Sequence, residues 1–202
     1  MIELDPIRFH GPEGLAPSLI AYPPDAPIGE QRLVGFHFMD AEIVLDPDQD
    51  ILTHYESRAI IRNALGETAD ESTGPLGVGH TQSIARLHMQ VRDKLGGDRE
   101  PGLLMDCLRS GVMRRTVRGD AKKFVLAPDD EAVLNLIACG HSQNECAERL
   151  FLAPGTIANH LRHIHRTTKL HGGATLIATA LVATRDKVGG FRLGPVPPSS
   201  SR

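Results

Sequence analysis

The sequence contains no tryptophan, two tyrosines, six phenylalanines, three cysteines and no long apolar run. Cys107, Cys139 and Cys146 cannot all pair, and their spacings match no zinc or redox motif, so we expect small, buried, reduced side chains. A stretch of about 18 apolar residues, as a membrane span requires, is not present. The first residues lack the basic and apolar segments of a signal peptide, and a cytoplasmic protein is therefore expected.

Charge is unevenly distributed along the chain, although the net charge is only −3. Residues 1–121 carry 12 Lys and Arg against 19 Asp and Glu, a net charge of −7. Residues 122–202 carry 10 against 6, a net charge of +4, together with five of the ten histidines. A mildly basic C-terminal region joined to an acidic N-terminal region fits an attraction to phosphates at one end of the molecule.

The N-terminal region begins with an irregular, Pro- and Gly-rich segment of about 30 residues, in which Ser18–Ala21 is a short candidate strand. Alternation of side chains predicts a strand over Arg32–Met39, and Ala41–Leu45 is its expected hairpin partner. The acidic segment Asp46–Asp50 lacks the glycine and the closing glutamate of a calcium-binding loop, so we interpret it as a solvated turn.

Three helices are expected after this turn. Helical spacing of apolar residues predicts them over Leu52–Leu65, Thr81–Leu95 and Pro101–Val117, with a polar, Gly-rich break at Glu67–Val78. Their apolar stripes suit a core or a dimer seam. Residues 189–202 are rich in Pro and Ser and are expected to be a disordered tail.

Four short helices are predicted from Pro128 onward. The first, over Asp129–Cys139, begins with an acidic turn and ends at Gly140. The second begins at Ser142, where Ser142 and Glu145 form a capping box. The third begins near Pro154, and the fourth covers about Ala174–Asp186.

The third of these helices has two distinct faces. Ile157, Leu161, Ile164 and Thr168 follow helical spacing and should face inward. The opposite face then presents the residues Gly155, Ala158, Asn159, Arg162 and Arg166. This face is small at its start, becomes cationic and has no acidic residue, which suits the major groove of DNA.

Four segments of this region together resemble the LuxR/FixJ-type (GerE-like) helix-turn-helix. They are Leu134–Ser142, Glu145–Leu150, Pro154–Ile164 and Ala174–Ala178. The resemblance implies that the third helix enters the major groove and that the fourth forms the dimer contact, for which Ile177, Leu181 and Thr184 lie on one face. It implies base contacts by Ala158, Asn159 and Arg162. It further implies DNA-backbone contacts by Asn144, Thr156, Arg166 and, as a hydrogen bond or phosphate contact, His160.

The sequence departs from the family pattern at four positions. Ala158 and Asn144 stand where lysine is common, and Ala127 and Ala153 replace the usual capping Thr and Ser. Fewer cations imply fewer phosphate contacts and a shallower salt dependence of binding. Each missing cap is expected to cost about 1 kcal/mol of helix stability.

Histidines are frequent near the third helix, at positions 160, 163, 165 and 171. Only His160 and His163 share a helical face, and no carboxylate lies beside them at ligand spacing in the sequence. We therefore expect no metal site and no cofactor.

The expected fold is mainly α: a small α+β N-terminal domain followed by a four-helix LuxR-type helix-turn-helix domain. The domains are expected at 1–120, an acidic regulatory or dimerisation domain of no recognised family, and 121–188, which binds DNA. The expected function is a sequence-specific transcription regulator that binds a double-stranded operator as a homodimer, with RNA polymerase as a further candidate partner and no membrane association. No Ser/His/Asp, paired-carboxylate or glycine-loop arrangement suggests an enzyme.

Two alternatives remain open at this stage. One is a response regulator with a degenerate receiver domain, for which Asp40 is the single candidate phosphorylation-site acid and the strand–helix alternation is not visible. The other is an N-terminal small-molecule sensor or enzyme domain that uses the helix-turn-helix for localisation. The scarcity of aromatic residues does not fit the pocket for an acyl-homoserine lactone that some relatives of this type carry.

Overall fold

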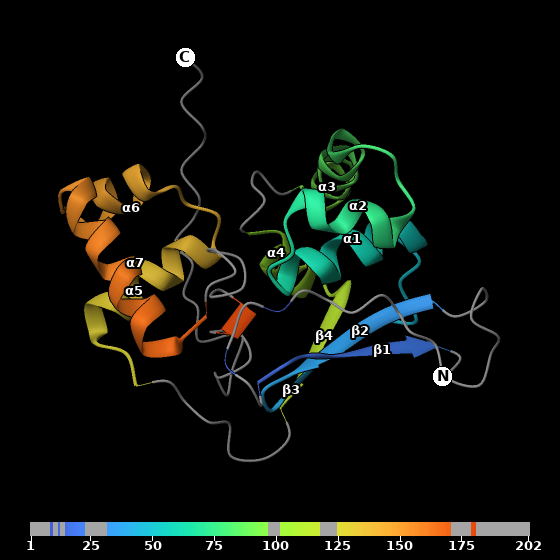
Figure 1. Cartoon of the computed structure of the whole chain (residues 1–202), viewed down its shortest axis with the longest axis horizontal. Coiled ribbons are helices and arrows are strands. Elements are labelled where there is room, and N and C mark those ends of the chain that lie inside the picture. The colour runs from blue at the N-terminus through green and yellow to red at the C-terminus, as the bar shows by residue number, and fades with distance from the viewer. Residues whose placement is uncertain are drawn as a thin grey trace.

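A small antiparallel sheet lies beneath a group of helices in the N-terminal part of the chain (Figure 1). The computed structural model describes residues 9, 12, 15–22, 32–96, 102–117, 125–170 and 179–180. Within them, the strands β1 (Ser18–Tyr22), β2 (Arg32–Phe38), β3 (Ala41–Leu45) and β4 (Met113–Val117) pair in the order β1-β2-β3-β4. The expected α+β character of this region is confirmed.

The hairpin of β2 and β3 forms the centre of the sheet and matches the predicted alternation. Phe36 pairs with Ile43 and Phe38 with Ala41, and all four side chains are buried. At Gly35, a Cβ atom would lie 2.2 Å from the backbone oxygen of Ile43, so that only glycine allows the two strands to approach this closely.

Four helices accompany the sheet: α1 (His54–Ala64), α2 (Ala69–Leu76), α3 (Thr81–Leu95) and α4 (Leu103–Arg109). The helices predicted over Leu52–Leu65 and Thr81–Leu95 are confirmed. The predicted break at Glu67–Val78 is wrong, because α2 lies within it. Thr68 and Glu71 form a capping box that initiates this helix, and Pro75 lies inside it.

The third predicted N-terminal helix is also wrong in its second half. Helix α4 ends at Arg109, and Gly111 has a φ of 77°, a left-handed conformation that turns the chain. The chain then returns as β4, which pairs antiparallel with β3 and places Met113 opposite Leu45. Hydrogen bonding to the edge of β3 outweighs the helical spacing from which the longer helix was predicted.

A buried ion pair connects α1 to the turn that precedes α2. The guanidinium nitrogen Nη1 of Arg62 lies 2.8 Å from both carboxylate oxygens of Glu67, and both side chains are 1% exposed. Ser72 adds a hydrogen bond to Glu67 Oε2. Arg62 is thus buried as part of a paired and hydrogen-bonded group.

Three helices form the described part of the C-terminal region: α5 (Pro128–Ala138), α6 (Gln143–Leu150) and α7 (Pro154–Thr168). They match the first three predicted helices of this region. Their shared core consists of the buried residues Val133, Ile137, Cys146, Ala147 and Ile157. The fourth predicted helix lies outside the described residues except for Thr179 and Ala180, which are helical, and the predicted tail at 189–202 also lies outside them.

The C-terminal helices also pack against the N-terminal part. Leu134, Ala138, Ile164, Leu170 and Ala180 belong to the same apolar cluster as the sheet and α1. The hydroxyl of Thr179 donates a hydrogen bond of 2.7 Å to the backbone oxygen of Ala64, the last residue of α1. The two regions therefore share a buried contact surface as well as having their own cores.

Two further expectations concern the cysteines and membrane-spanning helices. The cysteines are unpaired, as predicted, with Cys107 and Cys146 buried and Cys139 partly so. In the ranges that the structure describes, no helix is both long enough and apolar enough to cross a bilayer.

Candidate nucleic-acid interface

Helix α7 has the two faces that the sequence predicted. Ile157, Ile164 and Thr168 are buried, and Leu161 packs partly buried against the core of the three helices. Thr168 closes the helix by donating a hydrogen bond to the backbone oxygen of Ile164. Because these four residues fix the rotation of α7 about its axis, the remaining face is directed away from the core.

The outward face of α7 carries the predicted reading residues. Asn159, Arg162 and Arg166 are exposed, whereas Thr156, Ala158 and His160 are half-buried. The guanidinium of Arg162 donates a hydrogen bond to the side-chain oxygen of Asn159, one turn earlier. The Asn159 amide nitrogen and the other guanidinium donors thus lie side by side, which is the kind of donor set that base edges and phosphates accept.

The N-terminal end of helix α6 is a second candidate for contact with DNA. Ser142 and Glu145 form the predicted capping box, with Glu145 Oε2 accepting from the Ser142 backbone nitrogen at 2.8 Å. Asn144, in the first turn, is exposed. Free backbone N–H groups at a helix N-terminus attract phosphate, and this end of α6 is therefore suited to a DNA-backbone contact.

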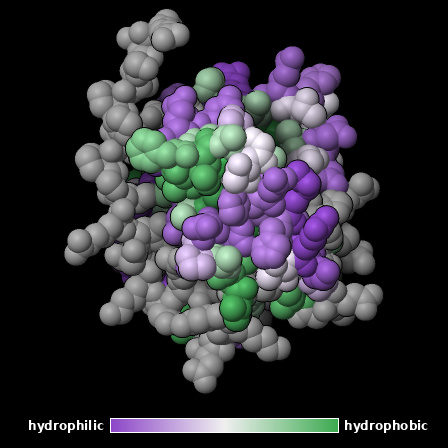
Figure 2. Space-filling model, turned by 90° about the vertical axis from the view of Figure 1, so that its left-hand side faces the viewer, coloured by the Kyte–Doolittle hydropathy of each residue, from purple (hydrophilic) through white to green (hydrophobic). Residues whose placement is uncertain are grey.

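The turn between α6 and α7 contains an exposed aromatic residue. Phe151 has a φ of 55° and caps α6, and its side chain is 96% exposed. The neighbouring Leu152 is also exposed. Figure 2, in which the end of the molecule formed by α5 to α7 faces the viewer, shows mainly hydrophilic side chains with a smaller hydrophobic area beside them.

An aspartate missed by sequence reasoning lies beneath helix α7. Asp130 of α5 is 2% exposed, and its two carboxylate oxygens lie 2.8 Å from His160 Nδ1 and 2.5 Å from His163 Nδ1. The expectation that no carboxylate accompanies these histidines held only along α7 itself. The sequence signal was the acidic turn Asp129–Glu131, but only the packing of α5 on α7 shows which of its members faces the histidines.

No metal site follows from this arrangement. Among the residues described, no cluster of His, Cys, Asp and Glu could hold a metal ion. Burial raises the pKa of Cys107 to about 12 and that of Cys146 to about 11, so both thiols are protonated at neutral pH. Asp130 instead contacts two histidines of α7.

Two helices of this region lack a side-chain cap, as the sequence predicted. Ala127 precedes α5 and Ala153 precedes α7, and neither supplies a hydrogen bond to the first turn. Each helix instead begins with proline, which has no N–H group to satisfy. No side chain therefore caps the first turn of α7.

The predicted dimer residues Ile177, Leu181 and Thr184 lie outside the described residues. Their neighbours Thr179 and Ala180 are buried, and both contact the N-terminal part. Part of the surface around residue 180 is consequently covered within one chain.

Comparison with known proteins identifies the C-terminal region. Residues 125–180 match the family model described as bacterial regulatory proteins, luxR family. The matched segment contains α5, α6 and α7 together with Thr179 and Ala180. No curated protein and no solved structure matches the chain.

Proposed function

Residues 125–180 form a LuxR-family regulatory domain, and from this premise we propose that the chain is a sequence-specific regulator that binds a double-stranded operator as a homodimer. The proposal assigns the reading of bases to α7 and includes no catalytic activity, metal or cofactor. It places the protein where bacterial DNA is found, in the cytoplasm, with RNA polymerase as a candidate partner on promoter DNA.

The observation that carries the proposal is the outward face of α7. A buried apolar stripe fixes the helix in place, and its exposed side presents Asn159, Arg162 and Arg166 with no carboxylate among the residues of the helix. A face of this composition attracts DNA phosphates, and Asn and Arg side chains can form paired hydrogen bonds with adenine and guanine.

We assign the residues to two kinds of contact. Ala158, Asn159 and Arg162 would face base edges, because Arg162 lies one helical turn after the adjacent pair Ala158 and Asn159 on the outward side of α7. Asn144, Thr156, His160 and Arg166 flank this strip and would contact the DNA backbone. Ala158 can offer a base only an apolar surface, such as that recognised by a thymine methyl group.

Dimerisation is supported by the size of the reading surface. One short helix contacts few base pairs, whereas two modules on half-sites about one helical turn apart combine two modest affinities. Ile177, Leu181 and Thr184 are the residues we propose for the seam.

The proposal is tested by selecting bound sequences from a random duplex library with the full chain. We expect a motif with two-fold or near two-fold symmetry, and a retarded complex on a duplex that carries it. Arg162→Ala should lose the preference for at least one position of the motif, whereas Arg86→Ala, at an exposed site on α3, should keep it. Selection of no motif would contradict sequence-specific binding.

The response-regulator alternative gains no support from the fold of the described N-terminal residues. A receiver domain has a parallel sheet with helices on both faces, whereas β1 to β4 pair antiparallel. The candidate acid Asp40 lies in the hairpin turn between β2 and β3. The small-molecule sensor alternative, in contrast, is favoured by a cavity in this same region.

A further inference from the structure

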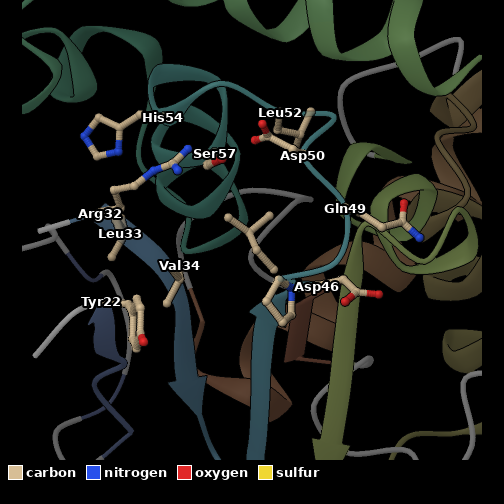
Figure 3. Close-up of a pocket in the computed structure, with 12 residues that line it drawn as sticks. Tyr22, Arg32, Leu33, Val34, Asp46, Gln49, Asp50, Leu52, His54 and Ser57 are labelled. Carbon is tan, nitrogen blue, oxygen red and sulfur yellow. The ribbon is translucent and has the colours of Figure 1, made fainter.

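A cavity of about 700 Å³ opens in the N-terminal part beside the hairpin of β2 and β3 and the start of α1 (Figure 3). Its size lies within the range of about 300–1,000 Å³ that is typical of small-molecule sites. Much of its lining is apolar, contributed by Leu33, Val34, Leu45, Pro47 and Leu52. Tyr22 of β1 adds an aromatic ring at the edge. An apolar ligand body of moderate size would be accommodated here.

One side of the cavity carries the nitrogen donors of Arg32 and His54. Arg32 begins β2 and is exposed, and no carboxylate pairs with it in the part of the chain that the structure describes. His54 begins α1, and its Nδ1 atom is buried without a hydrogen-bond partner among the described residues. Figure 3 shows the Arg32 side chain extending toward His54 and Ser57. A buried nitrogen without a partner is costly, and a ligand acceptor would relieve that cost.

The protonation of His54 is consistent with a hydrogen-bonding role. Burial lowers the pKa of His54, and the nearby Arg58 and Arg32 charges lower it further. A neutral imidazole can donate one hydrogen bond from either nitrogen, while Arg32 supplies the permanent charge.

The acidic residues of the cavity lie elsewhere. Asp46 is buried and its Oδ2 is 2.6 Å from Arg114 Nη2, while its Oδ1 accepts a hydrogen bond from the Asp48 backbone nitrogen. This carboxylate is therefore already paired with Arg114, and it stabilises the turn after β3. Gln49 lies on the same side as Asp46, across the cavity from Arg32 and His54, and Asp50 is exposed.

We propose that this cavity binds a small organic carboxylate with an apolar body. Arg32 and His54 hold the carboxylate group, and Leu33, Val34 and Leu52 surround the body. A carboxylate matches the guanidinium fork in shape and charge, which makes charge-assisted hydrogen bonds to Arg stronger than those between neutral groups.

Helix α1 connects this site to the DNA-binding region. It carries His54 and Ser57 at the cavity and ends at Ala64, whose backbone oxygen accepts the hydrogen bond from Thr179. An 11-residue helix spans about 16 Å and transmits a displacement as a rigid rod. This second step rests on the proposed function: a bound carboxylate changes the affinity for DNA because it biases the packing of α1 against residues 179–180.

Binding is tested on the full chain by calorimetry with two carboxylates, naphthylacetate and decanoate, and with their neutral primary amides. We expect at least one carboxylate to bind about tenfold more tightly than its amide, since only the anion gains the charge-assisted bond to Arg32. Arg32→Gln should remove this preference and leave amide binding unchanged. Arg86→Gln, which removes an exposed arginine on α3, should preserve it.

Three outcomes would overturn the site. They are no binding of either carboxylate at millimolar concentration, equal affinities of acid and amide, and a preference that survives Arg32→Gln. Because these measurements contain no DNA, they stand even if the protein proves not to be a sequence-specific regulator. The coupling step is measured separately, as a change in operator affinity on addition of the carboxylate that bound, and no change would overturn it.

Discussion

His160 Nδ1 lies 2.8 Å from Asp130 Oδ1, so that a side chain of α7 is anchored to α5 beneath it. A neutral or protonated His160 that donates through Nδ1 keeps its Nε2 atom for a second partner. In zinc and protease sites, a carboxylate orients an imidazole in the same manner. Here the contact fixes the ring of a half-buried histidine against α5 and leaves its Nε2 atom available to another partner.

We therefore predict that Asp130→Ala weakens DNA binding although Asp130 itself is buried. The loss should be about 1–3 kcal/mol, partly from stability and partly from the freed histidines. A double-mutant cycle with His160→Ala separates the loss due to stability from the loss due to the histidines. The effects of the two substitutions on DNA affinity are non-additive only if Asp130 acts through His160. Asp129→Ala, at the exposed neighbour, is the matched control. Additive losses in DNA affinity would reduce Asp130 to a purely structural residue.

The two arginines of the outward face should differ in effect. Arg162→Ala is expected to lower affinity for the selected operator by about 1–3 kcal/mol and to relax preference at one base pair. Arg166→Ala, one turn later, should weaken specific and random duplexes alike. Fluorescence anisotropy on both duplexes measures the difference. A loss at Arg166 that depends on the DNA sequence would mean that the residues reading bases extend toward the C-terminal end of α7.

A missing cap at the start of α7 offers a stabilising change. Ala153 has extended backbone angles and is exposed, and its side chain makes no hydrogen bond to the helix. Ala153→Ser should raise the free energy of unfolding by about 0.5–2 kcal/mol, since a serine oxygen accepts from the first turn. Urea unfolding of the full chain checks this value, with Ala153→Val as a variant that adds volume but no acceptor. An equal effect of serine and valine would contradict capping as the cause.

Much of this architecture was predictable from the sequence because it depends on local rules. The capping box of Ser142 and Glu145, the stripe of Ile157 and Ile164 and the alternation before Phe38 are each set by neighbours in the chain. The rotation of α7, and with it the exposure of Asn159 and Arg162, follows from the same stripe.

The features that were not predicted depend on contacts between distant segments. Residues 113–117 form a strand because β3 offers them an edge, and helical spacing before Gly111 could not reveal that edge. Asp130 contacts His160 and His163 because α5 packs on α7, although 30 or more positions separate them in the sequence. The cavity beside Arg32 and His54 likewise forms from separate strands and a helix, whose side chains have no common motif.

The ion pair of Glu56 predicts how stability depends on pH. Burial alone would raise the pKa of Glu56, but hydrogen bonds from Lys94 and from Thr53 lower it below its ordinary value. A carboxyl group whose pKa is depressed on folding stabilises the fold above its unfolded pKa, about 4.3. That contribution is lost as the pH falls through this value toward the folded pKa.

Unfolding in urea between about pH 6 and pH 3 should therefore show a falling stability that Glu56→Gln makes shallower. Asp70→Asn, at an exposed acid of α2, is the comparison and should leave the slope nearly unchanged. An identical slope for Glu56→Gln and the unaltered chain would contradict the role of the Lys94 pair.

The burial of Thr179 and Ala180 limits which side of the fourth predicted helix can form the proposed dimer seam. Thr179 and Ala180 are helical and buried against the N-terminal part. In the predicted helix, with about 3.6 residues per turn, Thr179 would lie opposite Ile177 and Leu181, whereas Ala180 would lie next to Ile177. The fourth predicted helix can then contact α1 within its own chain and a second copy on its other side.

Leu181→Asp should consequently leave the chain folded by circular dichroism, weaken operator binding and leave one protomer on each duplex. Thr179→Val removes the hydrogen bond to Ala64 on the opposite side and should retain two protomers per duplex. Analytical ultracentrifugation with a labelled operator counts the protomers. An unfolded Leu181→Asp chain would make the stripe part of the core. A folded variant that still binds as a pair would instead move the interface to the helices before residue 120, among which α3 exposes Met89.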